Sequence, residues 1–66
     1  MTVKVELLFC NDKNEPPNGI VCEITLYIDE SNLFLKRKLI EDHISYAYKM
    51  FEDITKINIS EEKYNI

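Results

Sequence analysis

The stretch SNLFLKRKLIEDHISYAYKMFEDIT, residues 31 to 55, decides the fold because it carries the longest run of helical spacing in the chain. At 100° per residue, apolar side chains recur at the i, i+3, i+4, i+7 spacing of a helix that lies on a core. This stripe comprises Leu33, Ile40, Ile44, Ala47, Phe51 and Ile54. The pattern predicts one long helix over residues 31 to 55.

A second apolar stripe runs beside the first and comprises Leu35, Leu39, Tyr46 and Met50. The two stripes together are wider than the roughly 100° arc that one sheet face covers. Tyrosine and methionine are also common where proteins contact each other. We therefore expect the second stripe, with the neighbouring acidic residues Glu41 and Asp42, to bind another chain. The alternative is that the stripe packs on the sheet of its own chain.

Two segments before the helix alternate between apolar and polar residues, which predicts strands over residues 2 to 10 and 20 to 29. The inward positions are Val3, Val5, Leu7 and Phe9 on the first strand and Ile20, Cys22, Ile24, Leu26 and Ile28 on the second. Lys4, Glu6, Leu8 and Cys10 are expected on the opposite face of the first strand.

The loop between the strands contains Pro16-Pro17 and Asn18-Gly19, which favour a turn and predict a hairpin. Opposed residue numbers that sum to 31 set Lys4 against Tyr27 and keep Glu6 away from Glu23. In this register Cys10 and Cys22 point to opposite faces, so no disulfide is expected within the chain.

Residues 56 to 60 alternate again and predict a short last strand, after which the charged tail is expected to fray. A right-handed crossover places this strand antiparallel beside the first, in the order 2-1-3. The sequence therefore predicts one α+β domain over residues 1 to 66, in the order ββαβ, with the helix on one face of a small antiparallel sheet. Residues 33 to 40 also alternate, so a third strand, βββα, is the alternative.

Size and charge limit the classes of partner. A chain of 66 residues buries only about 60% of its unfolded surface, which favours reinforcement by oligomerisation, such as a homodimer. The formal net charge of −4 argues against general nucleic-acid binding. The one basic cluster, Lys36-Arg37-Lys38, supports the alternative of a small nucleic-acid-associated regulator. No apolar run approaches the roughly 20 residues that span a bilayer, so no membrane partner is expected.

The residues that could perform chemistry are few and badly spaced for it. Cys10, Cys22 and His43 form no metal-ligand pattern and no arrangement for nucleophilic catalysis. We expect no enzyme activity, cofactor, metal or small-molecule ligand. With two cysteines and no signal peptide before the first strand, a reducing, cytoplasmic location is expected.

In length, acidity and order of elements, the chain resembles the small antitoxin and anti-defence proteins made by phages. Its excess of lysine over arginine, with many isoleucines and asparagines, is typical of AT-rich coding in a phage or a low-GC bacterium. The expected function is a non-catalytic protein-protein interaction module, an inhibitor that binds a larger protein either as a single chain or as a homodimer. The resemblance rests on no motif and assigns no functional residue.

Overall fold

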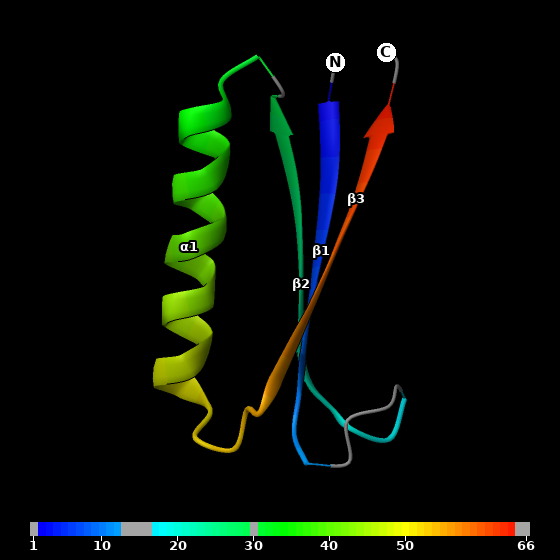
Figure 1. Ribbon diagram of the computed structural model, residues 1–66, viewed down its shortest axis with the longest axis vertical. Helices are drawn as coiled ribbons and strands as arrows, with labels where there is room; N and C mark the ends of the chain where they lie inside the picture. The colour runs from blue at the N-terminus through cyan, green and yellow to red at the C-terminus, as the bar shows by residue number, and fades with distance from the viewer. Residues whose placement is uncertain (1, 13–16, 30, 65–66) are drawn as a thin grey trace.

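The computed structural model describes residues 2 to 12, 17 to 29 and 31 to 64. These form an α+β fold with strands β1 (Thr2–Cys10) and β2 (Ile20–Asp29), helix α1 (Leu33–Met50) and strand β3 (Lys56–Tyr64). The sheet is antiparallel, its order is β2-β1-β3, and α1 lies on one face (Figure 1). The predicted ββαβ order and the strand order 2-1-3 are confirmed. Residues 33 to 40 are helical, which excludes βββα.

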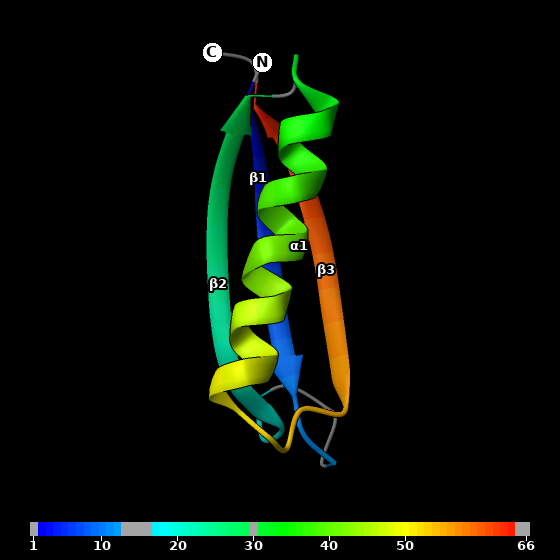
Figure 2. The ribbon, with the colours of Figure 1, turned by 90° about the vertical axis from the view of Figure 1, so that its left-hand side faces the viewer.

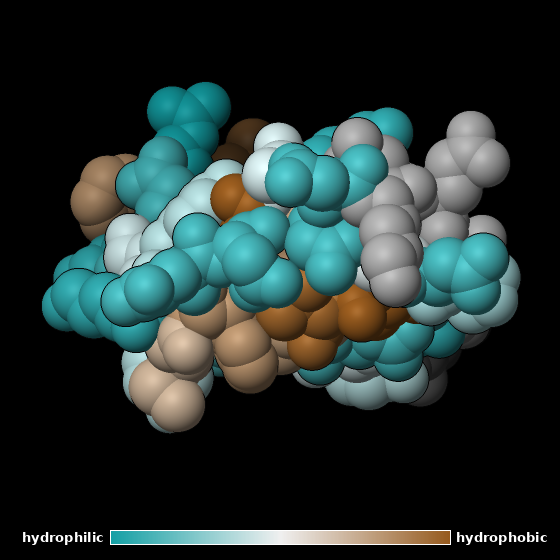
Figure 3. Space-filling model, turned by 90° about the horizontal axis from the view of Figure 1, so that it is seen from below, coloured by the Kyte–Doolittle hydropathy of each residue, from teal (hydrophilic) through white to brown (hydrophobic). Residues whose placement is uncertain are grey.

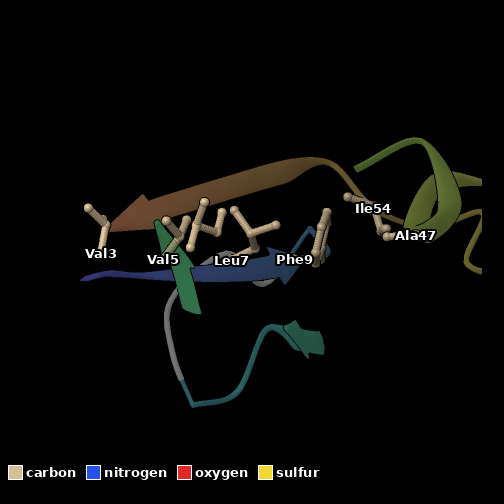
Figure 4. Packing of buried hydrophobic residues seen from close by; sticks show 7 residues of the cluster. Val3, Val5, Leu7, Phe9, Ala47 and Ile54 are labelled. Carbon is tan, nitrogen blue, oxygen red and sulfur yellow. The ribbon is translucent and has the colours of Figure 1, made fainter. Parts of the chain in front are cut away.

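The core is organised along β1, the central strand. Val3, Val5, Leu7 and Phe9 are fully buried and form one row on the side of the sheet that faces α1 (Figure 4). Ala47 of α1 and Ile54 of the following turn join the same cluster at the Phe9 end of the row. Strands on both sides and a helix above leave these four side chains no access to solvent, and the burial of apolar surface is the main stabilising term.

The predicted hairpin register is confirmed: Lys4 pairs with Tyr27 and Phe9 with Cys22. The pairing shifts between Phe9 and Cys10, so that Cys10 pairs with Ile20. Cys10 is fully buried, whereas Glu6 and Leu8, which are predicted to share its face of β1, are partly exposed. The irregularity interrupts the simple alternation of faces. The turn after α1 also closes over this end of β1, where the Thr55 amide donates to the Cys10 carbonyl at 2.8 Å.

The helix is shorter than predicted, and its extension to residue 55 is wrong. The Asn32 side chain accepts a hydrogen bond from the Leu35 amide at 2.9 Å and caps the N-terminus. At the other end the Phe51 amide donates to the Ala47 carbonyl, but Phe51 itself is extended. Ile54 keeps its core position from the turn, because the chain must reverse here to start β3.

The last strand is longer than predicted, since β3 continues to Tyr64 instead of ending at residue 60. It pairs with the whole of β1, from Lys56 opposite Cys10 to Tyr64 opposite Thr2. Charged side chains in its second half are accommodated because β3 is an outer strand. The prediction that the tail frays is thus wrong for residues 61 to 64, and residues 65 and 66 lie outside the described residues.

One helix is too narrow to cover this sheet. Three strands at about 4.8 Å spacing are wider than a helix of roughly 10 Å diameter. Figure 2 shows that α1 crosses diagonally, with its N-terminal half toward β3 and its C-terminal half over β2. Leu33 is consequently 66% exposed, and its predicted core position is wrong. It lines a shallow depression together with Glu61 of β3.

Candidate protein-binding surface

Helix α1 buries little of its apolar surface. Ala47 is its one buried residue among those described, while Leu39, Ile40 and Ile44 are partly buried against the core. Its exposed large apolar side chains are Leu33, Phe34, Leu35, Tyr46, Tyr48 and Met50. From the end of the molecule where α1 finishes, Figure 3 shows a band of apolar atoms gathered along one side, beneath a row of hydrophilic ones. Contiguous apolar surface of this kind is typical of a contact site.

An ion pair joins α1 to β3. The Lys36 ammonium nitrogen lies 3.0 Å from a carboxylate oxygen of Glu61. Together with Leu33, Arg37, Ile40 and Glu41, these two residues line a shallow depression between α1 and β3. The flank of α1 that carries Arg37 and Glu41 therefore faces the β3 side.

The opposite flank of α1 faces the β2 side and carries Leu35, Tyr46 and Met50, which we call the apolar flank. These residues are 44%, 61% and 58% exposed. They belong to the stripe predicted from the sequence. Leu39 does not share their exposure: it is partly buried and packs on the core, because it lies closer to the sheet than Leu35 does. Leu39 stays a predicted contact residue, but it exposes less of its surface than the other three residues of the stripe.

The two acidic residues of the predicted site are both exposed, but the structure separates them. Asp42 lines a shallow depression with His43 and Tyr46 on the apolar flank. Glu41 lines the depression on the β3 side. Adjacent helical residues point about 100° apart, so one continuous surface includes only Asp42.

Strand β2 adds a feature that sequence reasoning missed. It is an outer strand, and within the described residues no other strand pairs with its far side. An unpaired edge presents backbone N–H and C=O groups to other chains, and natural proteins usually protect it with charges. β3 carries Lys56, Glu61, Glu62 and Lys63, whereas β2 carries one charge, Glu23, before its terminal Asp29. The predicted strand order 2-1-3 already contained this signal.

The residues weighed for chemistry are held by backbone carbonyls. The Cys10 and Cys22 sulfur atoms each lie 4.0 Å from a carbonyl oxygen, that of Leu8 and of Glu23 respectively. The His43 Nδ1 lies 2.7 Å from the Leu39 carbonyl oxygen, to which it donates. Within the described part of the chain, no three histidine, cysteine, aspartate or glutamate side chains gather where they could hold a metal ion.

One ionisable group with a shifted pKa stands where α1 begins. The backbone amide of Ser31 donates to the Asp29 carboxylate at 3.0 Å. This hydrogen bond, followed by one from the Ser31 side chain, lowers the pKa of Asp29 below its ordinary value. Since both hydrogen bonds favour the charged form, Ser31 stabilises the ionised Asp29 carboxylate.

The helix in the described residues is neither long nor apolar enough to cross a membrane. Comparison with models of protein families, with curated proteins and with solved structures finds no match to this chain.

Proposed function

We propose that this chain is a non-catalytic protein-protein interaction module, which binds another chain through α1. The observation that supports it is the apolar flank: Leu35, Tyr46 and Met50 are exposed on one side of α1. Single exposed apolar residues are ordinary on protein surfaces. These three lie on the same flank of α1, and the C-terminal half of the helix, which carries Tyr46 and Met50, lies over the outer strand β2.

The energetics favour a covering chain. Full burial of a side chain of this size is worth about 1.5 to 3 kcal/mol, so three partly exposed ones supply a useful part of a binding energy. Tyrosine and methionine also suit an interface, because the first combines apolar area with a polar tip and the second adapts its shape. Asp42 at the rim and the net charge of −4 favour a partner with a basic surface around an apolar centre.

The alternative of nucleic-acid binding has less support. Of its three cations, Lys36 is paired with Glu61 and partly buried. Arg37 and Lys38 are exposed, and two cations neutralise too few phosphates for strong binding at physiological salt.

The test compares two tyrosines on different flanks of α1. Three proteins are immobilised separately: the wild-type chain, Tyr46→Glu and Tyr48→Glu. Each is incubated first with purified wild-type chain and then, in a second experiment, with a cell lysate, and the proteins that it retains are identified by mass spectrometry. Tyr48 is the matched control because it is also exposed, at 47%, but lies away from the apolar flank. Tyr46→Glu should lose chains that the wild type and Tyr48→Glu retain. If Tyr46→Glu retains the same chains as the wild type, the proposed function is wrong.

A further inference from the structure

We propose that the chain covering the apolar flank is a second copy of this protein, joined by antiparallel pairing of β2 with the partner's β2 about a twofold axis. The two three-stranded sheets would become one continuous sheet with both helices on the same face. This inference rests on the proposed function and names its partner. One contact would then hydrogen-bond the unpaired backbone groups of β2 and cover the exposed apolar flank of α1.

The faces of β2 restrict how two copies can pair. Even-numbered residues of β2 face α1, as the buried Ile28 and the partly buried Ile24 and Leu26 show. In a twofold antiparallel pair, opposed residue numbers have a constant sum. An even sum keeps the apolar faces of the two copies on the same side, whereas an odd sum puts the helices on opposite faces.

Repulsion between like charges excludes some of the registers with an even sum. A sum of 46 opposes Glu23 to the partner's Glu23, and a sum of 52 opposes Glu23 to the partner's Asp29, so both set like charges together. Sums of 48 and 50 instead oppose Glu23 to Thr25 or to Tyr27. These two registers also pair the most residues, 20 to 28 or 21 to 29. The axis therefore passes through Ile24 or Thr25, and β2 is compatible in charge with its own copy.

The helices then meet along the apolar flank. An antiparallel helix pair in which opposed residue numbers sum to 85 would set Leu35 opposite the partner's Met50 and Tyr46 opposite the partner's Leu39. This pairing sets apolar residues against apolar residues.

The diagonal course of α1 makes the two surfaces fit. Its C-terminal half leans over β2 and carries Tyr46 and Met50, while its N-terminal half leans toward β3 and leaves room beside Leu35 (Figure 2). A twofold axis brings the leaning half of each helix beside the set-back half of the other. The diagonal course leaves the sheet of one chain incompletely covered, and it also makes the helix surfaces of the two copies complementary to each other.

Disulfide trapping tests the pairing. Directly opposed residues of antiparallel strands have Cα atoms about 4.5 to 5.5 Å apart, within the range of a disulfide. In a Cys22→Ser background, Thr25→Cys alone should cross-link if the axis passes through Thr25. A mixture of Glu23→Cys and Thr25→Cys chains should form the mixed disulfide if it passes through Ile24. The control is Ser60→Cys on β3, which is exposed on the other outer strand.

Under mild oxidation at micromolar concentration, one of the two β2 reactions should run roughly tenfold or more faster than Ser60→Cys, since pairing raises the effective thiol concentration. Both β2 reactions running no faster than Ser60→Cys would overturn the dimer. If the dimer is overturned in this way, but the wild type captures another protein from the lysate that Tyr46→Glu does not capture, then only the identity of the partner is wrong. If Tyr46→Glu loses no chain, the proposed function fails as well.

Discussion

Lys36 and Glu61 join α1 to β3 across 25 positions of sequence, with the ammonium nitrogen 3.0 Å from the carboxylate. The contact holds the N-terminal half of the helix toward β3, over the polar part of the sheet. Because the residues of a helix keep fixed angles to one another around its axis, Leu35 and Tyr46 face the β2 side when Lys36 faces Glu61. A surface pair of small energy thereby contributes to the position of the candidate binding surface.

The Lys36 to Glu61 pair should make a small but measurable contribution to stability. A double-mutant cycle with Lys36→Met and Glu61→Gln should give a coupling of about 0.5 kcal/mol in urea denaturation, because exposed pairs are screened by water. The coupling should fall further in high salt. The same cycle with Glu23→Gln, an exposed residue on β2, should give none. Zero coupling for Glu61 at low salt would show that the pair does not orient α1.

Two leucines four residues apart should differ in their effect on folding. Leu39→Ala removes a side chain packed on the core and should cost roughly 1 to 3 kcal/mol of unfolding free energy. Leu35→Ala removes an exposed side chain and should cost less than about 0.5 kcal/mol in the separated chain. Thermal or urea denaturation at low protein concentration measures both. Equal losses would mean that the helix is rotated from the position described.

The cap on α1 gives a prediction for local stability. Asn32→Ala removes the acceptor for the Leu35 amide and should cost about 1 kcal/mol. Asn32→Asp keeps an acceptor at the positive end of the helix and should retain the stability of the wild type. Circular dichroism during urea denaturation gives both values. A loss in Asn32→Asp as large as that in Asn32→Ala would show that this hydrogen bond does not stabilise the helix start.

Asp29 should make stability depend on pH in the acid range. Its pKa is lower in the folded chain than the ordinary value of 3.8, so its contribution is present above 3.8 and is lost as pH falls through the folded pKa. The advantage of the wild type over Asp29→Asn should therefore be constant at neutral pH and shrink below pH 3.8. Urea denaturation at a series of pH values measures it. An advantage that grows on acidification would contradict the role given to the Ser31 hydrogen bonds.

The sheet was predictable because its alternation is strong and one-sided. Val3, Val5, Leu7 and Phe9 share one face of β1, and a central position buries that face along its whole length. Matching faces limited the hairpin to odd sums of opposed residue numbers, and keeping Glu6 away from Glu23 selected the observed register. The burial of Cys10 was not predictable from the alternation of β1, since the turn after α1 closes over this end of the strand and the Thr55 amide donates to the Cys10 carbonyl. The length of β3 also escaped prediction, because the second half of the strand pairs through its backbone and carries charged residues that favour no strand by themselves.

The candidate surface was predictable in part. The width of the apolar arc indicated that Leu35, Tyr46 and Met50 would stay outside the core. A helical wheel could not separate them from Leu39 or place Leu33, because both depend on the angle at which α1 crosses the sheet. That angle is set by contacts between distant segments. The unprotected edge of β2 could have been predicted from the sequence. It follows from the predicted strand order together with the distribution of charged residues on the two outer strands.

Sedimentation equilibrium of the wild-type chain, Tyr46→Glu and Tyr48→Glu tests the central claim most directly, because it measures whether the apolar flank is covered by a second copy. The wild type and Tyr48→Glu should have twice the 7.8 kDa mass of one chain at micromolar concentration, and Tyr46→Glu should have the mass of a single chain. One and the same mass for all three proteins would contradict the account.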